Sequence, residues 1–391
     1  MKHETMATTI NACAAHYGEQ ADEMRSYLQQ GLERALDLPN RGPIRFDKDG
    51  NLHSGILAAY STFGFYVFED VLKEEELKDI REEMDSLNER FPIAPDSDLD
   101  MQGRKAISVD NKTHPLVWSK PLADPLGGST LASGRHQVKL IEPEADENAP
   151  EHIVFIVLGS LQFSETALRV YGHPDLLKVA EQVNGDDFAP FNESLFIKEP
   201  GRGAAVSWHQ DGVTHWDNPE FDENIHGFNF MAQVYGSDPV NGVWVVPGTH
   251  KKGKLDIVKL VEESGSERLK DAVPLVCGAG DVVICNRQLV HGSFANSGLH
   301  PRVTVNFGFH KRKSVLGAMG SGIHSDALVF DEEVIKERSR VIGYAIDARQ
   351  KRFPEETPFF YKPFVKNGEH YVWDEEAKSG LLDYNAYDLS I

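Results

Sequence analysis

The 391-residue chain has few cysteines and no long apolar run. Its three cysteines, Cys13, Cys277 and Cys285, provide neither a disulfide framework nor a Cys-x-x-Cys zinc motif. No run of about 18 apolar residues occurs, and the N-terminal Met-Lys-His-Glu-Thr-Met lacks the apolar core of a signal peptide. We therefore expect no membrane span, no secretion signal and a cytoplasmic location.

Positive charge is also scarce. The chain has 40 Lys and Arg against 61 Asp and Glu, which gives a formal net charge of −21. This excess of negative charge repels phosphate groups, so it argues against nucleic acid and anionic membranes as partners. Residues 201–315 contain 12 basic and 12 acidic residues, which leaves 28 basic and 49 acidic residues elsewhere. This neutral region suits an anionic ligand. Alternatively, the acidic residues elsewhere simply form a solvated surface, and the uneven charge has no functional meaning.

Short apolar segments separated by Gly and Pro turns predict a mainly β fold. No repeat with a period of about 20 to 50 residues is visible, which excludes solenoids and propellers. We expect strands at 60–72, 190–198, 227–235, 280–286 and 302–309, with one face of the third formed by Phe228, Phe230 and Ala232. Such a pattern is typical of a double-stranded β-helix (jelly roll, cupin-like) core flanked by helices.

Helical periodicity predicts additions on both sides of this core. Met24, Leu28, Leu32 and Leu36 define an amphipathic N-terminal helix, and further helices are expected at 73–85, 173–185, 255–271 and 331–342. We therefore divide the chain into a helical N-terminal extension (1–55), a double-stranded β-helix domain (56–312) and a C-terminal extension packed on the core (313–391). The aromatic tail from Phe353 to Tyr387 covers the barrel or forms a homodimer contact.

Two polar segments are hard to assign. The Pro- and Gly-containing stretch from Pro92 to Glu151 is long for a loop in a compact domain, and such loops often serve as lids or binding loops. We expect it to contribute to a substrate entrance, with its histidines, His114 and His136, facing solvent. A second polar loop is expected at 217–224.

The most informative segment is Ser207-Trp208-His209-Gln210-Asp211-Gly212. Residues i and i+2 of a β-strand point to the same face, so an extended chain lets His209 and Asp211 reach one metal ion. His291, in Val290-His-Gly-Ser293, is the candidate third ligand. Two histidines and one carboxylate are typical of non-haem Fe(II) oxygenases, because they leave positions open for a cosubstrate and O₂. Alternatively, His209 is a packed strand residue and Asp211 caps a turn; the same ligands also suit Mn, Co or Ni.

Three further segments accompany these residues. Lys198-Glu-Pro-Gly-Arg-Gly precedes them, Asn241-Gly-Val-Trp-Val-Val-Pro-Gly-Thr-His250 lies between them, and Arg302 follows His291 by eleven residues. Together they resemble the phytanoyl-CoA dioxygenase family of Fe(II)/2-oxoglutarate oxygenases. That family typically shows Trp-His-x-Asp, then Asn-Gly-x-x-x-x-Pro-Gly-Ser-His, then a distal His followed by Ser, Asn and Arg. The resemblance runs from about Phe63 to about His310.

The resemblance implies that Fe(II) binds His209, Asp211 and His291. His250 is the rival third ligand, because the Pro-Gly turn before it suits a strand end, but in the family this histidine does not bind iron. We therefore prefer His291.

The resemblance also implies a cosubstrate site. Arg302 would bind the far carboxylate of 2-oxoglutarate through its planar, permanently charged guanidinium, and Ser293 would donate a second hydrogen bond to that carboxylate. The alternatives are a surface ion pair for Arg302 and a turn for Ser293. Lys198 adds positive charge or is an ordinary edge-strand lysine.

The function implied is that of a dioxygenase that hydroxylates an unactivated C–H bond of a small-molecule metabolite and converts 2-oxoglutarate and O₂ to succinate and CO₂. Related halogenases carry a small residue at the place of Asp211, so the carboxylate favours hydroxylation, while desaturation and ring closure stay open. Two alternatives from other classes are a cupin-type metalloenzyme that does not use 2-oxoglutarate and a non-catalytic jelly-roll binding protein. The sequence shows no basic-aromatic groove for nucleic acid.

Overall fold

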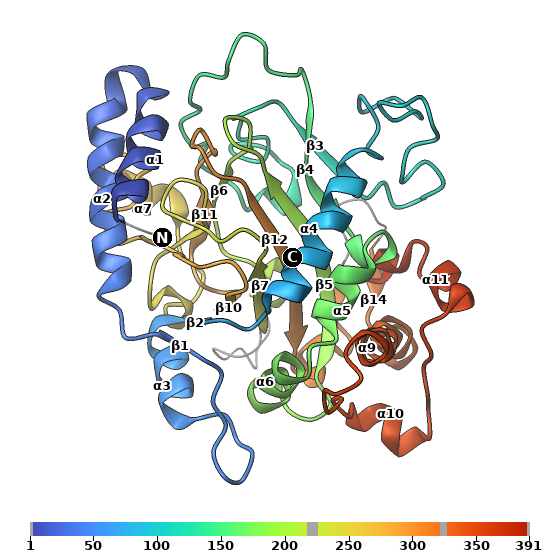
Figure 1. The fold of residues 1–391 in the computed structure, drawn as a ribbon. Helices are drawn as coiled ribbons and strands as arrows, with labels where there is room; N and C mark the ends of the chain where they lie inside the picture. The colour runs from blue at the N-terminus through green and yellow to red at the C-terminus, as the bar shows by residue number, and fades with distance from the viewer. Residues whose placement is uncertain (1–2, 217–225, 321–326, 389–391) are drawn as a thin grey trace.

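The computed structural model describes residues 3–216, 226–320 and 327–388. The polar loop expected at 217–224 lies outside these residues. Strands form a jelly-roll core, and helices cover it on two sides (Figure 1). The predicted mainly β fold with helical additions is therefore confirmed. Within the described ranges, no helix combines the length and the apolar character needed to cross a membrane.

The larger sheet has eight strands in the order β1-β2-β10-β7-β12-β5-β4-β3. Its neighbours are antiparallel except for β1 and β2. The strands are β1 (Arg41–Gly42), β2 (Phe65–Phe68), β3 (Leu116–Ser119), β4 (Ile153–Leu158), β5 (Ala189–Lys198), β7 (Phe228–Gln233), β10 (Val282–Asn286) and β12 (Arg302–His310).

The two faces of this sheet differ in polarity. In β12 the odd-numbered residues 303–309 belong to the main hydrophobic core, whereas Arg302, Thr304 and Asn306 line a cavity on the opposite face. Alternate side chains of a strand point to opposite faces, so one strand supplies both a buried apolar layer and a polar one. The predicted apolar face of β7 is confirmed, because Phe228, Phe230 and Ala232 all join the main core.

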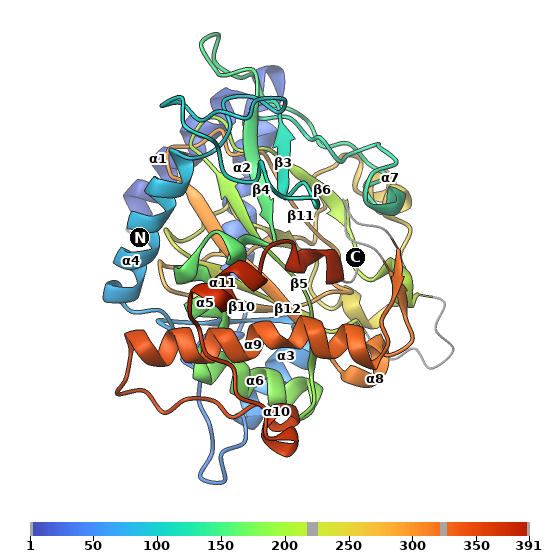
Figure 2. The ribbon, with the colours of Figure 1, turned by 90° about the vertical axis from the view of Figure 1, so that its right-hand side faces the viewer.

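Helices cover the apolar face of the larger sheet. Among those that contribute to the main core are α3 (Ser54–Phe63), α4 (Glu74–Asn88), α5 (Glu165–Tyr171), α6 (Pro174–Asn184) and the long α9 (Glu332–Arg352). Figure 2 shows α9 lying across this side of the molecule, with α6 and α10 (Lys362–Asn367) beside it. Tyr361, Phe364, Trp373 and Tyr384 of the C-terminal segment are buried in the same core. The remaining C-terminal elements are α8 (Arg312–Val315), β13 (Met319–Gly320), β14 (Leu328–Val329) and α11 (Glu375–Gly380).

The smaller sheet has the order β6-β11-β8-β9 and carries His209 on β6 and His291 on β11. Its strands are β6 (Val206–His209), β8 (Trp244–Val245), β9 (Val273–Pro274) and β11 (His291–Ser293), and α7 (Ile257–Ser264) lies between β8 and β9 in the chain. Helices α1 (His3–Ala15) and α2 (Ala21–Leu36) pack beside this sheet (Figure 1). A Cβ on Gly31 of α2 would lie 2.2 Å from the ring of Trp244, so only glycine permits this close approach.

The structure corrects three predicted elements. Residues 54–63 form helix α3, so the strand expected at 60–72 is confined to Phe65–Phe68. The His53 side chain accepts a hydrogen bond from the Gly55 N–H at the start of α3, and Gly64, with φ of 83°, ends it. The prediction was wrong because this helix-terminating glycine was taken for one inside a strand.

The other two differences concern helix length. The helix expected at 255–271 ends at Ser264, because Gly265 adopts φ of 75°. The helix expected at 331–342 continues to Arg352 as α9. In α2, Met24 and Leu28 are buried as predicted, but Leu36 is 46% exposed.

Candidate active site

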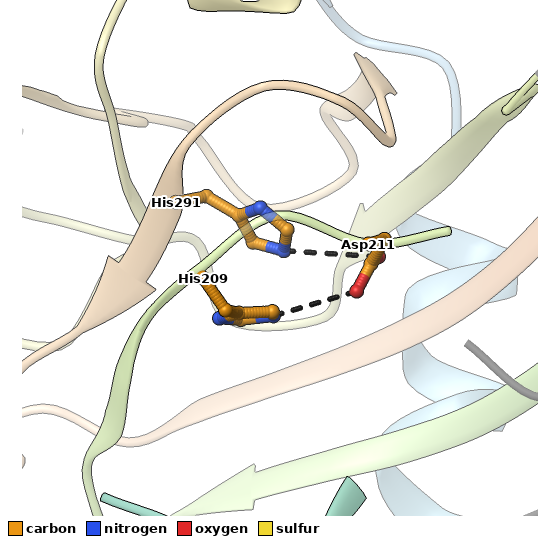
Figure 3. A group of neighbouring side chains, drawn as sticks. All are labelled: His209, Asp211 and His291. Atoms are coloured by element: carbon orange, nitrogen blue, oxygen red, sulfur yellow. Dashed lines mark ion pairs between the residues drawn. The ribbon is translucent and has the colours of Figure 1, made fainter. Parts of the chain in front are cut away.

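Strand pairing brings the two predicted histidine ligands together. His209, at the end of β6, lies directly opposite His291, at the start of β11, and their ring centroids are 4.0 Å apart. Asp211 follows β6, and its backbone N–H donates to the carbonyl of Arg287 at 2.9 Å. Figure 3 shows the three side chains pointing toward one another. One ligand atom from each residue lies within 4.8 Å of the others, and all three side chains are buried.

The backbone sets the protonation of both rings. His209 Nδ1 lies 2.8 Å from the carbonyl oxygen of Ser207, and His291 Nδ1 lies 2.8 Å from that of Leu289. A carbonyl can only accept, so each Nδ1 carries the proton and each Nε2 is left with a lone pair. Burial lowers the pKa of His209 well below its usual value and also lowers the pKa of His291. Neutral imidazoles facing a common centre are the form that binds a metal ion.

Asp211 is held as a carboxylate by two buried arginines. Its Oδ1 lies 3.6 Å from Arg135 Nη2, and its Oδ2 lies 3.6 Å from Arg287 Nε. Burial opposes ionisation of Asp211, but the two guanidinium groups outweigh it and keep the pKa of Asp211 below its usual value. His209, Asp211 and His291 therefore offer two neutral nitrogens and one hard anionic oxygen, a donor set that fits Fe(II).

These residues open into a cavity of about 100 Å³ between the two sheets. Arg302 and Ser293, the two predicted cosubstrate residues, also line it. Arg302 is 2% exposed; burial lowers its pKa to about 10, which leaves it charged at neutral pH. One of its nitrogens, Nη1, donates to the carbonyl of Asn241 at 3.0 Å. The structure thus places all five predicted site residues around one cavity.

Lys198 has a more specific place than the sequence indicated. It is 2% exposed and lies on β5, between β12 and β4, so it is not an edge-strand residue. Its Nζ donates to Ser293 Oγ at 2.7 Å, and the residue lies opposite Arg302 in the strand register. The sequence around Lys198 does not indicate the strand order that brings Lys198 to Ser293 and Arg302, so its position could not be predicted.

The segment expected to form a substrate entrance does reach the cavity. Leu126, Arg135 and His136 all line it. The expectation that His136 faces solvent was wrong: it is fully buried, its ring lies 4.2 Å from that of His209, and its Nδ1 lies 3.1 Å from Ser207 Oγ. Burial and the nearby Arg135 lower the pKa of His136 to about 3, so it is neutral.

His250, the rival third ligand, lies apart from the cluster. Its Nε2 is 3.1 Å from the carbonyl oxygen of Ser61, and its ring packs against Gly64. Within the described ranges, the only group of His, Cys, Asp and Glu residues with metal-site geometry is His209, Asp211 and His291. The three cysteines are buried and free, so no disulfide forms among them.

Fold and site define the class: a jelly-roll protein in which two histidines and one carboxylate converge beside a buried arginine, as in non-haem Fe(II) oxygenases. Comparison with known families identifies the group within this class. The family model "Phytanoyl-CoA dioxygenase (PhyH)" matches residues 60–304, and the chain belongs to this family. Its members are Fe(II)/2-oxoglutarate-dependent oxygenases, and this chain is accordingly an oxygenase that uses iron and 2-oxoglutarate.

Individual relatives are distant. The chain is 24% identical to a phytanoyl-CoA dioxygenase of Arabidopsis thaliana over 63% of this chain and 84% of that protein. It is 30% identical to phytanoyl-CoA dioxygenase 1 of Oryza sativa subsp. japonica, over 27% of this chain and 38% of that protein. Among solved structures, EctD from S. alaskensis, solved with 2-oxoglutarate and 5-hydroxyectoine, is 18% identical, with a TM-score of 0.47, over 70% of this chain and 81% of that one.

Proposed function

We propose that this oxygenase hydroxylates an unactivated C–H bond of a small-molecule metabolite. His209, Asp211 and His291 bind the iron, and Arg302 with Ser293 binds the far carboxylate of 2-oxoglutarate. The observation that carries the proposal is the convergence of these five side chains on one buried cavity. Fe(II) held by these ligands would supply O₂ activation coupled to the oxidative decarboxylation of 2-oxoglutarate to succinate and CO₂.

The protein's own residues give this site three properties. The Nδ1 hydrogen bonds of His209 and His291 fix the ring orientations before metal binds. The guanidinium of Arg302, positioned by the Asn241 carbonyl, matches a carboxylate in shape and charge. Apolar side chains on the remaining cavity wall, including Ile156, Leu158 and Phe196, exclude water from the reacting carbon.

The test is an anaerobic titration of Fe(II)-loaded protein with 2-oxoglutarate, followed through the visible charge-transfer band of the iron chelate. We expect the band in wild type, its loss in His291→Ala, and a much higher half-saturation concentration in Arg302→Ala. His250→Ala, which removes the rival histidine, is the matched control and should keep the band. Thermal unfolding of each variant separates loss of the site from loss of the fold.

Each other outcome supports a different function. Iron binding without the band would favour a cupin-type metalloenzyme with another cosubstrate. A protein that binds no iron would be a jelly-roll binding protein. Once the band is established, candidate metabolites are screened for those that stimulate the formation of succinate from 2-oxoglutarate. Mass spectrometry of the oxidised metabolite then distinguishes hydroxylation, which adds one oxygen atom, from desaturation or ring closure.

A further inference from the structure

The cavity carries a guanidinium group that the proposed cosubstrate site does not use. Arg135 comes from the segment that covers the site, and only 10% of its side chain is exposed. Its Nη2 lies 3.6 Å from Asp211 Oδ1, and its Nε donates to His136 Nε2 at 3.3 Å. Arg302, by contrast, pairs with Lys198 in the strand register and lines the cavity with Ser293. The cavity therefore has one arginine beside Ser293 and another beside Asp211.

The loop formed by residues 124–140 fixes the position of Arg135. Asp124, which is 3% exposed, accepts hydrogen bonds from the backbone N–H groups of Gly127 and Leu140 and so closes the segment into a compact loop. Just before Arg135, Ala132 and Ser133 have φ of 47° and 59°. Left-handed backbone in residues other than glycine costs free energy and occurs often at ligand sites.

The charges of the described residues around the cavity do not balance. Among its described lining residues, Asp211 is the only carboxylate, whereas Arg135 and Arg302 line it and Arg287 lies behind Asp211. Fe(II) and the 2-oxoglutarate dianion carry opposite charges of equal size, so loading the site does not remove this excess of positive charge. In a buried site such an excess is poorly screened and favours an anionic ligand.

We propose that Arg135 binds a carboxylate group of the substrate, so that the enzyme acts on a small organic acid. This inference rests on the proposed function, because it takes Arg302 to be occupied by 2-oxoglutarate. The acid group would lie beside Asp211, and its carbon chain would extend along the apolar wall that includes Ile156 and Phe196. A cavity of about 100 Å³ restricts the part of the substrate that reaches the metal to a compact group.

The test uses the full-length protein with Fe(II) and saturating 2-oxoglutarate under anaerobic conditions. Butyrate, hexanoate, benzoate and phenylacetate are titrated, each beside its primary amide, by calorimetry and by perturbation of the chelate band. We expect at least one acid to bind at least tenfold more tightly than its amide. Arg135→Gln should weaken that binding at least tenfold, and Arg135→Lys should weaken it less. Lys139→Gln, which removes a half-exposed cation from the same segment, should leave it unchanged.

The outcomes separate this inference from the proposed function. Equal binding of acids and amides, no acid binding by wild type, or unchanged binding by Arg135→Gln would each overturn the role of Arg135. Loss of the chelate band in Arg135→Gln would also overturn it, because Arg135 would then act on the metal centre. Absence of the band in wild type would instead contradict the proposed function, while the calorimetric comparison of wild type with Arg135→Gln still reports on the acid site.

Discussion

Lys198 Nζ donates a 2.7 Å hydrogen bond to the hydroxyl of Ser293 and a 2.6 Å hydrogen bond to the carbonyl of Phe294. Burial, reinforced by the positive charge of Arg302, lowers the pKa of Lys198 well below its usual value of 10.5. An anion bound beside Ser293 and Arg302 stabilises the charged form of Lys198 and so raises this pKa again. If 2-oxoglutarate binds there, as we propose, its binding is coupled to the protonation of Lys198.

We predict that 2-oxoglutarate binding takes up protons at pH values above the lowered pKa of Lys198. The affinity should fall as the pH rises above the lowered pKa of Lys198 in the unliganded protein, because the bound state retains the proton. Calorimetric titrations in two buffers of different protonation enthalpy measure the uptake. Lys198→Met should abolish it and weaken binding roughly tenfold, or about 1.4 kcal/mol. Binding heats of wild type that do not depend on the buffer would contradict this coupling.

Arg287 is predicted to be a positioning residue for Asp211. Its side chain is fully buried, its Nε lies 3.6 Å from Asp211 Oδ2, and its guanidinium lies 3.8 Å from the ring centroid of Phe191. Removing a partner that orients a metal ligand typically weakens metal affinity by about 10- to 100-fold. Arg287→Met should show this weakening in an Fe(II) titration, and Arg287→Lys should restore part of the affinity. If both variants bind Fe(II) as wild type does, Arg287 serves the fold alone.

Gly212 is predicted to be indispensable for the geometry of the carboxylate ligand. It follows Asp211 with φ of 90°, and a Cβ there would lie 1.6 Å from the ring of His226. Gly212→Ala combines backbone strain with this clash, so we expect it to destabilise the fold by about 2 to 4 kcal/mol and to weaken Fe(II) binding. Gly201→Ala is the control, because Gly201 has φ of 67° but nothing within 4 Å of the added Cβ. Chemical unfolding of both variants separates the clash from the strain, and equal losses would show that the clash contributes nothing.

Glu193 is predicted to make stability pH-dependent. It lies on β5 between two cavity-lining residues but faces the opposite side, where Ser160 and Tyr384 donate hydrogen bonds to it. Burial raises the pKa of Glu193 from 4.5 to about 7. The folded state therefore binds this proton more tightly, and the contribution of Glu193 to stability should be greatest below about pH 4.5 and be lost as the pH rises to about 7, by roughly 3 kcal/mol.

Asp388 contributes in the same direction, since burial raises its pKa from 3.8 to about 6 despite the ion pair with Arg338. Urea unfolding between pH 5 and about 8 measures the combined slope. Glu193→Gln should flatten the part contributed by Glu193. If Glu193→Gln and wild type show the same slope of unfolding free energy against pH, the dependence comes from other groups.

The local features of this protein follow from its sequence. His209 and Asp211 share a face because the side chains of a strand alternate, and the alternation of β12 from Arg302 to Phe309 already separates a polar face from an apolar one. The resemblance to the dioxygenase family added His291, Arg302 and Ser293, and the structure places all of them around the cavity. These patterns depend on residues close in the chain or on spacings that the whole family shares.

Only the tertiary structure decided the features that depend on strand order and on long-range contacts. Lys198 is buried because β5 lies between β12 and β4, and Arg287 reaches Asp211 because the turn after β10 passes behind the site. Arg135 and His136 enter the cavity through a loop whose path is fixed by Asp124 and by left-handed backbone, and no periodic pattern marks such a path. Local periodicity and the spacings of the family therefore indicated which residues can bind the metal, while the packing of distant segments determined which charges surround it.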